Sequence, residues 1–559
     1  MATEEQRHSL QNKIKEHRIK EEDRLMEYLA EKYRIPVVRM TGTQVDPNAL
    51  QLVKEAEARE ARAAVYSHLK GTLGIAVNEP NNPKLKEVLR ALEERGYSHK
   101  LALASTQTLE RMWEFYKDIV ATSASTPGTL SITNKELTEE TKDVRSLESA
   151  KQLLEGMKEM SMARKISKNV GYITAIAIAI NASDIHLEPN SDGGVVRYRI
   201  DGVLTDVAQF SKKEFKQLIT RMKLVSHMKI TARGAQDGGF VIRLPDRTIS
   251  VRASVIPDEE GGAFVLRLLD PNNVIHDIQT LGLHPVILKV FNEHIKRPNG
   301  MILTTGPTGS GKTTTLYSFL NAIKTEEVKI ITLEDPIEYR LRGIVQTQID
   351  KNYSFASGLR SILRQDPDII LVGEIRDEEV AEIAVQSALT GHLVLSTLHT
   401  NDALGALPRL AQLKIDSQAF SRAINIIIAQ RLVRLLCEKC SEQHPLTDEQ
   451  KKKIHDLIAE FPEGYRDKEL HTDMIKRPSE ASKGCKHCTG GYRGRIGVFE
   501  VFEVNDAVEQ AYRSAGGITA MQNAVKDQGL PFMKDDGLWK VLQGMTSLEE
   551  IERVVGVRI

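Results

Sequence analysis

The sequence predicts a multidomain α/β protein, and three observations support this prediction. The chain has 559 residues, which is enough for about three or four domains. Short β-prone segments alternate with segments whose apolar residues have helical spacing, the pattern typical of α/β units. One such pair of segments, residues 300–305 and 314–323, flanks a glycine-rich turn. With 41% hydrophobic residues, the chain has enough apolar side chains for an ordinary core in each domain.

Residues 1–120 are predicted to form a first N-terminal α/β domain. Its first 35 residues are charged and favour a helix. The expected strands are 74–77 and 101–104, and the expected helices are 83–95 and 106–116. Residues 121–145 are polar and contain few large apolar side chains, so we predict a flexible linker there.

Residues 146–274 are predicted to form a second N-terminal domain. Helical spacing of apolar residues covers 148–181 and 212–228. The expected strands are 194–200, 240–244, 248–253 and 263–268. Asp201 and Gly202 are predicted to form a turn after the first of these strands.

The third predicted domain, residues 275–559, begins with a phosphate-binding P-loop. Residues 306–313 fit the pattern G-x-x-x-x-G-K-[ST], with a strand before and a helix after it, as the motif requires. The glycines let backbone N–H groups turn towards phosphate oxygens, and the positive end of the helix adds to that field. Lys312 is predicted to contact the outer phosphates, and the Thr313 hydroxyl to bind Mg²⁺. The predicted nucleotide-binding residues of this segment are Gly306, Pro307, Thr308, Gly309, Ser310, Gly311, Lys312, Thr313 and Thr314.

A second acidic segment indicates where the attacking water would lie. Residues 369–372 are four apolar residues, as in a buried parallel strand. Glu374, just after them, is predicted to orient or deprotonate the attacking water. Gly373 stands where the Walker B aspartate usually does, so the metal contact is expected to be indirect or shared.

Two further segments add candidate residues to the nucleotide site. Residues 331–338 contain three carboxylates, those of Glu334, Asp335 and Glu338, which together suit a divalent cation or a polarised water. His392 and His399 flank an apolar strand, and we predict that they sense the γ-phosphate.

The four cysteines form two C-x-x-C pairs. They are Cys437, Cys440, Cys485 and Cys488. This arrangement indicates a tetrahedral zinc site rather than unrelated free thiols. Because all four thiolates would bind the metal, no coordination position stays open, and we expect a structural role within residues 437–495.

Charge and hydropathy exclude some classes of protein. Lys+Arg and Asp+Glu number 76 each, which argues against a global nucleic-acid-binding surface, although a local basic patch remains compatible. No apolar run reaches the length of a membrane span, and the charged N-terminus has no signal region. We therefore expect a cytoplasmic protein that meets a membrane only through a partner.

Four sequence motifs described above, in their order along the chain, resemble those of the type II secretion and type IV pilus ATPase superfamily. They are the Walker A segment 306–313, the aspartate box 331–338, the Walker B segment 368–377 and the histidine box 390–400. Residues 429–437 and 488–495 are similar to the zinc-bearing members of the PilB and GspE type. Residues 182–189 and 198–202 match the family's second N-terminal domain, whereas residues 1–120 resemble its first N-terminal domain only loosely.

The resemblance implies a RecA-like P-loop ATPase core, a PAS-like α/β N-terminal lobe and a zinc-bearing C-terminal insertion. It also implies a hexameric ring that binds ATP, Mg²⁺ and structural Zn²⁺. Arg252 and Arg267 match the arginines that reach the phosphates, so the catalytic set implied is Glu374, Lys312, Arg252, Arg267, Glu338 and His399. The work would pass to an inner-membrane platform protein of the PilC or GspF type, and the N-terminal domain would bind another assembly protein. The ring would then lie at the inner face of the cytoplasmic membrane.

The chain departs from the family pattern in two places. The family's Pro-Gln-Asp-Gly-Arg stretch is Ala235-Gln-Asp-Gly-Gly239 here, so one arginine is lost. A family Gly-Glu is Gly262-Ala263 here. Some N-terminal domains of the family bind cyclic di-GMP through Arg-Leu-Gly motifs, but only 23–29 resembles one in part, and we expect no such site.

Several functions fit the pattern to different degrees. Pilus assembly and type II secretion share all these motifs. A retraction motor is disfavoured by the cysteine pairs and the long N-terminal region. A DNA-uptake or nucleic-acid translocase is disfavoured by the neutral charge and the lack of basic–aromatic interleaving, and a non-catalytic scaffold by the intact Lys312 and Glu374.

Overall fold

The computed structural model divides the chain into two compact units, residues 1–127 and 128–559. The charged segment 1–25 and nearly all of the expected linker lie outside the described residues. The motif-like segment 23–29 lies outside them in part. The structure describes residues 26–38, 45–50, 52–69, 71–120, 129–131, 141, 144, 146–156, 162–230, 234–258, 262–273, 277–466 and 473–556. Within these ranges, no helix combines the length and apolar character needed to cross a bilayer.

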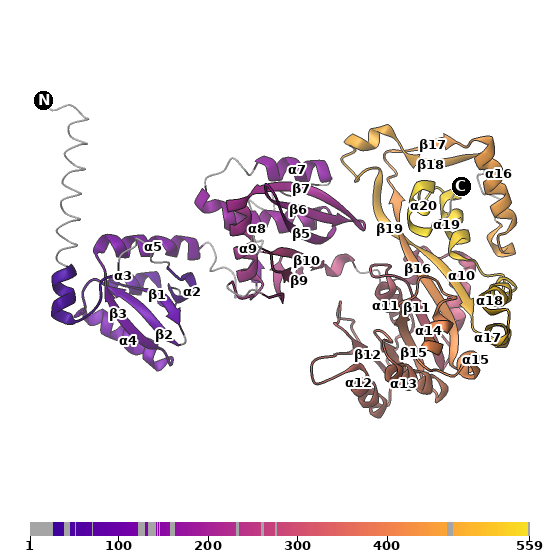
Figure 1. The fold of residues 1–559 in the computed structure, drawn as a ribbon, viewed down its shortest axis with the longest axis horizontal. Coiled ribbons are helices and arrows are strands. Elements are labelled where there is room, and N and C mark those ends of the chain that lie inside the picture. The colour runs from indigo at the N-terminus through magenta and orange to yellow at the C-terminus, as the bar shows by residue number, and fades with distance from the viewer. Residues whose placement is uncertain are drawn as a thin grey trace. The chain divides into compact units, whose positions relative to one another are not determined.

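The first unit is a three-stranded sheet with helices around it (Figure 1). Its strands, in spatial order, are β1 (Ala63–Leu69), β2 (Thr72–Val77) and β3 (Ser98–Leu103), and its helices are α2 (Pro47–Leu50), α3 (Glu55–Glu60), α4 (Pro83–Glu94) and α5 (Thr106–Val120). The first strand pair is antiparallel and the second is parallel. Strand β1 is absent from the sequence-based prediction because the helix-favouring residues of α3 run almost directly into it, separated by Arg62 in a left-handed conformation (φ 48°).

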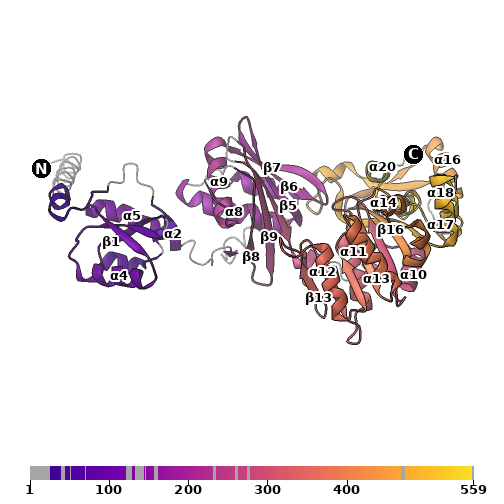
Figure 2. The same ribbon diagram turned by 60° about the horizontal axis from the view of Figure 1, so that its bottom comes forward.

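The second unit begins with a seven-stranded sheet. Its strands, in spatial order, are β4 (Thr129–Ser131), β8 (Gln236–Arg243), β9 (Thr248–Ile256), β10 (Ala263–Leu269), β5 (Ala182–Asn190), β6 (Gly193–Ile200) and β7 (Val203–Ser211). Helices α7 (Leu147–Gly156), α8 (Met162–Ala179) and α9 (Lys212–Val225) cover one face of this sheet. Figure 2 shows α8 and α9 beside its strands. Strand β4 pairs with β8, so part of the expected linker is a strand of this sheet.

The P-loop core is a second seven-stranded sheet. Its spatial order is β13 (Val345–Gln348), β12 (Ile330–Glu334), β14 (Ile369–Val372), β15 (Leu393–Leu398), β11 (Gly300–Thr305), β16 (Ile424–Leu436) and β19 (Tyr492–Glu503). All neighbours are parallel except β16 and β19. Strands β11, β12, β14 and β15 are buried along their whole length. Their carboxyl ends therefore meet at one edge of the sheet, where ligands bind in open parallel sheets.

The cysteine region connects the two antiparallel strands of this sheet. Between β16 and β19 lie the small sheet β17 (Ser441–Pro445) and β18 (Met474–Pro478) and the helix α16 (Asp448–Ala459). The other helices of the core are α10 (Pro285–His294), α11 (Lys312–Ile323), α12 (Phe355–Ile362), α13 (Glu378–Leu389), α14 (Ala406–Gln412), α15 (Phe420–Ala423), α17 (Asp506–Arg513), α18 (Gly517–Lys526), α19 (Met533–Leu542) and α20 (Leu548–Val555). The α/β class predicted from the sequence is confirmed by these sheets and helices.

A fully buried ion pair anchors α19 to this core. Lys540 and Asp536 are both 0% exposed and are in direct contact. The same carboxylate accepts the Phe499 N–H at 2.8 Å and the Tyr465 hydroxyl at 3.3 Å. Asp536 therefore joins α19 to β19 and to the cysteine region. Burial lowers the pKa of Lys540, and the Asp536 charge opposes that shift.

Replacing Lys540 by methionine should destabilise α19 by about 3–5 kcal/mol, because the substitution leaves the Asp536 carboxylate buried without its counter-charge. Hydrogen–deuterium exchange of the α19 peptides, with a urea titration, measures this effect. Lys534→Met is the matched control, because Lys534 on the same helix forms an exposed pair with Glu460 and should change stability by at most about 1 kcal/mol. Equal effects of the two substitutions would contradict a special role for the buried pair.

Candidate functional site

The P-loop leaves β11 and enters α11 in a conformation that requires glycine. Gly306, Gly309 and Gly311 have φ values of 143°, 80° and 90°, which L side chains rarely adopt. A Cβ on Gly306 would lie 2.5 Å from the Gln430 carbonyl oxygen of β16. The Ser310 hydroxyl is buried and has no hydrogen-bond partner within the described residues. The loop therefore has backbone and side-chain donors that suit phosphate oxygens.

Lys312, at the start of α11, folds back over the loop. Its Nζ donates to the carbonyl oxygens of Gly306 and Pro307, at 2.8 and 3.1 Å. Burial lowers the pKa of this ammonium, and the Glu374 charge opposes that shift. Thr313 is exposed beside it, so its hydroxyl is available to a metal ion carried by a nucleotide.

Glu374 lies beyond β14 between a guanidinium and an imidazole, those of Arg376 and His399. One carboxylate oxygen lies 3.0 Å from His399 Nε2, and the other pairs directly with Arg376. The Arg376 guanidinium also lies 3.5 Å from Asp335 Oδ2. The structure thus brings together residues from the Walker B segment, the histidine box and the aspartate box. Arg376 was not singled out from the sequence, although the Gly-Glu-x-Arg-Asp ending placed a cation two residues from Glu374.

The environment of Glu374 favours its ionised form. Burial alone would raise the pKa of this carboxyl, but the hydrogen bonds and charges of Arg376 and His399 outweigh burial and lower the pKa. A carboxylate with a lowered pKa is a weak proton acceptor at neutral pH. Of the two roles predicted, orienting water therefore fits the structure better than removing its proton.

The aspartate box does not form the predicted cation-binding cluster. Glu334 is buried and accepts hydrogen bonds from Tyr317, Thr332 and Gln346. Burial raises its pKa, and these hydrogen bonds oppose that shift. The other two carboxylates of the predicted cluster face other groups.

Those two carboxylates belong to Asp335, which faces Arg376, and Glu338, which lies 3.3 Å from Arg252. The three carboxylates diverge because each meets a donor from a different part of the fold.

The two histidines lie at opposite ends of strand β15, which corrects the prediction for His392. Strand β15 pairs in parallel with β11, and Leu398 lies opposite Thr305, the residue before the P-loop. His399 follows Leu398 and reaches Glu374. His392 precedes the strand, and its Nδ1 lies 3.1 Å from the Ser387 carbonyl oxygen. His392 therefore lies at the end of β15 away from the P-loop and Glu374.

The two candidate arginines differ in their contacts. Arg252 of β9 donates from Nη2 to the Ile337 carbonyl oxygen at 2.8 Å and pairs with Glu338. It joins the second N-terminal sheet to the aspartate box. Arg267 of β10 instead donates from Nε to Asp184 Oδ1 at 3.0 Å, within its own sheet.

Hydroxyl groups hold the histidine box against the P-loop, and sequence reasoning missed them. The Thr305 hydroxyl donates to the Thr400 carbonyl oxygen at 2.9 Å and accepts the Thr400 N–H at 3.0 Å. The buried Glu500 carboxylate of β19 accepts the Ala403 N–H at 2.8 Å. These contacts fix the backbone directly after His399, at Thr400 and Ala403. Their only sequence signal is a pair of threonines, one directly before Gly306 and the other directly after His399.

Gly373 allows close packing where a Walker B aspartate would stand. Its N–H donates to the Leu333 carbonyl oxygen at 2.8 Å, and an added Cβ would lie 3.1 Å from that oxygen. The carbonyl oxygen of Gly373 accepts the Thr397 hydroxyl at 2.8 Å. The glycine thus lets β12, β14 and β15 close together directly below Glu374.

The four cysteines meet in space, although the pairs are far apart in sequence. Their Sγ atoms all lie within 4.8 Å of one another, and those of Cys440 and Cys488 are 3.5 Å apart. Four sulfurs around a tetrahedral ion with Zn–S bonds of about 2.3 Å would be about 3.8 Å apart. The antiparallel pairing of β16 and β19 creates this site, because Cys437 follows β16 and Cys488 precedes β19. The cluster therefore fits a closed Cys₄ metal site.

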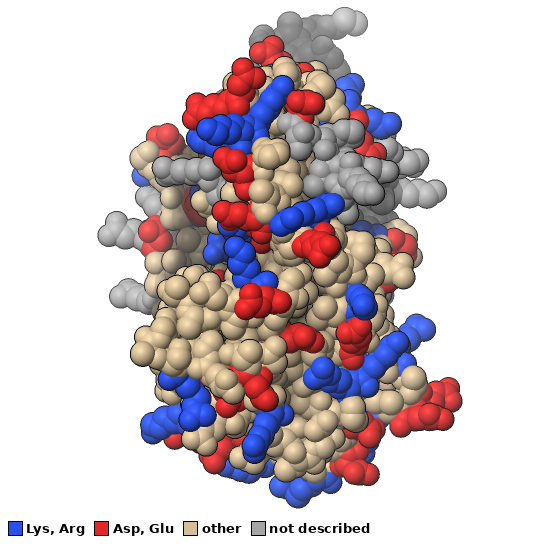
Figure 3. All heavy atoms as spheres, turned by 90° about the vertical axis from the view of Figure 1, so that its right-hand side faces the viewer, with Lys and Arg blue, Asp and Glu red and all other residues tan. Residues whose placement is uncertain are grey.

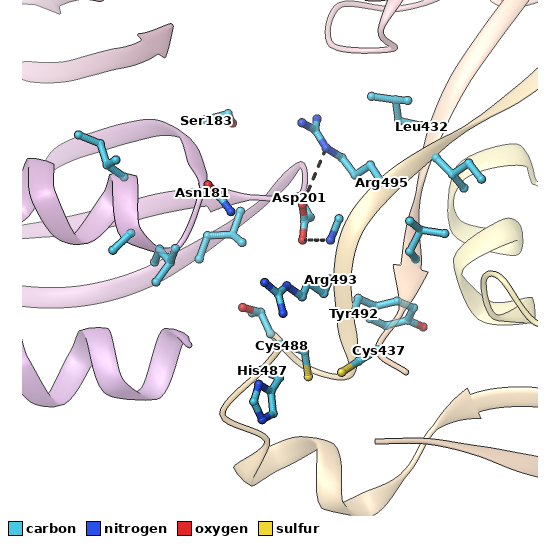
Figure 4. Close-up of a pocket in the computed structure, with 18 of the residues that line it drawn as sticks. Asn181, Ser183, Asp201, Leu432, Cys437, His487, Cys488, Tyr492, Arg493 and Arg495 are labelled. Atoms are coloured by element: carbon cyan, nitrogen blue, oxygen red, sulfur yellow. Dashed lines mark hydrogen bonds and ion pairs between the residues drawn. The ribbon is translucent and has the colours of Figure 1, made fainter. Parts of the chain in front are cut away.

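A cavity of about 1290 Å³ lies between the second N-terminal sheet and the P-loop core. Gly311 and Thr314 of the P-loop segment line it at one side, and Cys437, Cys488 and His487 at another. Asp201, at the β6–β7 turn, points towards β19 (Figure 4). It accepts the Gly494 N–H at 2.8 Å, and Arg495 Nε lies 4.0 Å from its other oxygen. This turn and Arg252 are two points where the sheet contacts the nucleotide-binding core.

Comparison with known proteins places these features in context. Residues 159–553 match the model of a family described as type II/IV secretion system protein, and residues 33–119 match the MshEN domain. The chain is 44% identical over 382 residues to the type II secretion system protein E of Aeromonas hydrophila, covering 68% of this chain and 73% of that protein. It is 36% identical over 541 residues to the type IV pilus assembly ATPase PilB of Myxococcus xanthus, covering 95% and 91%. The fold is similar to that of the Legionella pneumophila ATPase DotB, with a TM-score of 0.51 and 21% identity, over 71% of this chain and 97% of that one.

Replacing Arg376 by glutamine should move the acidic limb of the pH–rate profile for ATP hydrolysis to higher pH. Activity requires ionised Glu374, whose pKa is now below its ordinary value, so activity is lost only as the pH falls through that low pKa. Without Arg376 the pKa rises, and activity is lost at a higher pH. Steady-state kcat measured between pH 4 and 8 tests this shift. Arg360→Gln removes an exposed arginine that pairs with Glu379 away from the site and should leave the profile unchanged. An unaltered profile in Arg376→Gln would contradict the role given to Arg376.

Proposed function

The chain belongs to the type II/IV secretion system protein family, and we propose that it is the motor ATPase that powers type IV pilus assembly. That it is an ATP-hydrolysing enzyme follows from its family. The observation that carries the finer proposal is the extent of the likeness to the pilus assembly ATPase of Myxococcus xanthus. That likeness covers 95% of this chain and therefore includes most of the first unit.

Type II secretion is the second candidate, and one observation favours it. The identity to type II secretion proteins reaches 44% over 382 residues, whereas the pilus ATPase is 36% identical over 541 residues. Those alignments cover 68–75% of this chain, which leaves a quarter or more of it unmatched. The region that the pilus relative matches in addition is the reason we prefer pilus assembly.

The proposed chemistry assigns each group near the P-loop a task. The P-loop N–H groups and Lys312 bind the β- and γ-phosphates, and the Thr313 hydroxyl would hold the Mg²⁺ that neutralises phosphate charge. Glu374, held ionised by Arg376 and His399, orients the attacking water. Arg252 and Arg267 add positive charge near the transferring phosphoryl group. Arg252 already contacts the aspartate box through Glu338, which supports its place in this site.

Closure of the second N-terminal sheet on the core would convert hydrolysis into movement. In the proposed function six copies form a ring, and each passes its movement to an inner-membrane platform protein at the cytoplasmic face of that membrane. The first unit is the proposed site for another protein of the assembly complex. Direct nucleic-acid binding is not part of the proposal, because basic and acidic side chains are interspersed on the face shown in Figure 3.

We infer that Zn²⁺ binds the four cysteines and holds the ends of β16 and β19 together. Chelating the ion should then increase hydrogen–deuterium exchange in residues 437–495, because four thiolates would lose the ion that joins them. The P-loop peptides should change little. Metal analysis by mass spectrometry gives the stoichiometry, with one zinc per chain expected. Cys440→Ser should lower that content, and unchanged exchange after chelation would end the zinc assignment.

Replacing Glu374 by glutamine tests the proposed function directly. The purified variant should bind ATP but lose at least about 100-fold in kcat, because the water is no longer oriented by a carboxylate. Introduced at the native locus, it should abolish surface pili as counted by electron microscopy. Secretion of exoproteins, measured in parallel, should continue. Loss of secretion with normal pili would establish the second candidate instead.

Mutation of an exposed glutamate gives the control for this experiment. Glu379→Gln removes a carboxylate from α13 that pairs with Arg360 and lies outside the nucleotide site. It should preserve both turnover and pili. Full hydrolysis by Glu374→Gln would exclude the role given to Glu374.

A further inference from the structure

One row of side chains crosses four adjacent strands of the second N-terminal sheet. Arg252 of β9 lies opposite Arg267 of β10, Arg267 lies opposite Asp184 of β5, and Asp184 lies opposite Arg199 of β6. Residues directly opposite each other point to the same face. The alternate residues of β5, Ile185 and Leu187, are fully buried in the core of this domain. The row therefore lies on the face away from that core.

This row contains like charges on neighbouring strands, and two carboxylates compensate them, one from outside the row and one within it. Two arginines directly opposite each other on paired strands repel, at a cost of about 0.2–1 kcal/mol. Arg252 is neutralised from outside the sheet by Glu338. Arg267 and Arg199 share Asp184, which is only 6% exposed. Asp184 is thus the one acid within the row, and it lies between two arginines.

The way in which Asp184 binds Arg267 determines where the guanidinium points. Oδ1 accepts from Arg267 Nε at 3.0 Å, and Oδ2 accepts the Ser183 hydroxyl at 2.8 Å. Neither terminal nitrogen of Arg267 has a hydrogen-bond partner within the described part of the chain, and the side chain is 51% exposed. The carboxylate holds the inner edge of the guanidinium and leaves the outer pair of N–H groups free. That pair is the edge that binds phosphate oxygens in a bidentate manner.

Arg199 differs from Arg267 in this respect. Its Nη1 donates to the Gly202 carbonyl oxygen at 3.3 Å, and its Nε lies 3.4 Å from Asp184. Arg199 is therefore occupied by the turn that follows β6. Of the two arginines that share Asp184, only Arg267 presents its outer edge.

We propose that Asp184 is a positioning residue for ATP hydrolysis, which fixes Arg267 with its outer N–H groups directed to the phosphates. This inference rests on the proposed function, in which Arg267 acts on the transferring phosphoryl group. It assigns a role to a residue of the segment Ala182–Pro189, no part of which has a role in the proposed nucleotide chemistry. Asp184 itself does not touch the nucleotide.

The test compares Asp184→Asn, Arg267→Ala and the double variant in the full-length chain with ATP and Mg²⁺. Asparagine keeps the shape of the side chain but removes its charge, so the guanidinium is held less tightly. We expect kcat to fall about tenfold, less than the roughly 100-fold loss that a misplacement of about 1 Å can cause, with the Kd for ATP within about twofold. Adding Asp184→Asn to Arg267→Ala should cost nothing more. Asp206→Asn is the control, because it removes an exposed partner of Arg197 on the same sheet and should not change kcat.

Each result separates this inference from the proposed function. If Arg267→Ala loses turnover and Asp184→Asn does not, the positioning role is wrong and the proposed function stands. Additive losses would show that Asp184 is merely structural. If Arg267→Ala keeps full turnover, Arg267 has no catalytic role, and the inference falls with that part of the proposed function.

A further variant covers the case in which Asp184→Asn does not fold. Arg267→Lys keeps the charge, but an ammonium cannot contact Asp184 with one edge and phosphate with another. It should reproduce the tenfold loss in kcat. Wild-type turnover with lysine would overturn the proposal.

Discussion

The parallel register between β11 and β15 is the constraint on which the nucleotide site depends. It sets Thr305 opposite Leu398, so the P-loop and His399 emerge from the sheet side by side. On its other side, β15 pairs with β14, and buried hydroxyls of β15 secure the register of that pair. Ser396 donates to the Val372 carbonyl oxygen and Thr397 to that of Gly373, both at 2.8 Å. A shift by one residue would leave these groups unsatisfied in the core, at about 1–3 kcal/mol each, and would separate Glu374 from His399.

Strand β16 pairs with β11 and leads from the P-loop to the cysteine cluster. Near the P-loop its buried Gln430 accepts the Thr315 hydroxyl of α11 at 2.7 Å. Beyond its far end lies Cys437, whose N–H donates to the Gly491 carbonyl oxygen at 2.8 Å. Between them, Arg434 pairs with Glu550 of α20, whose pKa is lowered to about 2 because the hydrogen bonds from Arg553 and Arg434 outweigh burial. A single strand therefore connects the phosphate-binding loop to the cysteines and to the C-terminal helix.

Sequence reasoning located the boxes of the site but not the partners within it. The boxes are predictable because each consists of a strand followed by a polar turn, a local pattern. Apart from Thr332, the partners of Glu334, Asp335 and Glu338 come from other segments of the chain, and no local pattern indicates them. The position of His392 could have been predicted from the length of the strand. Six strand residues separate it from His399, and at about 3.3 Å per residue the two histidines must lie at opposite ends of the strand. Strand β1 was missed because tertiary pairing with β2 decided its conformation.

Gly239 lies next to Arg252 on β8, at the end of the arginine row. It stands where the family pattern has a further arginine, so that end of the row carries less positive charge here. A Cβ at this position would lie 2.7 Å from the Val251 carbonyl oxygen, so the spacing of strands β8 and β9 leaves no room for a side chain there. The substitution is therefore hard to reverse by a single change. An arginine at residue 239 would require strands β8 and β9 to move apart. The backbone spacing therefore keeps this charge absent.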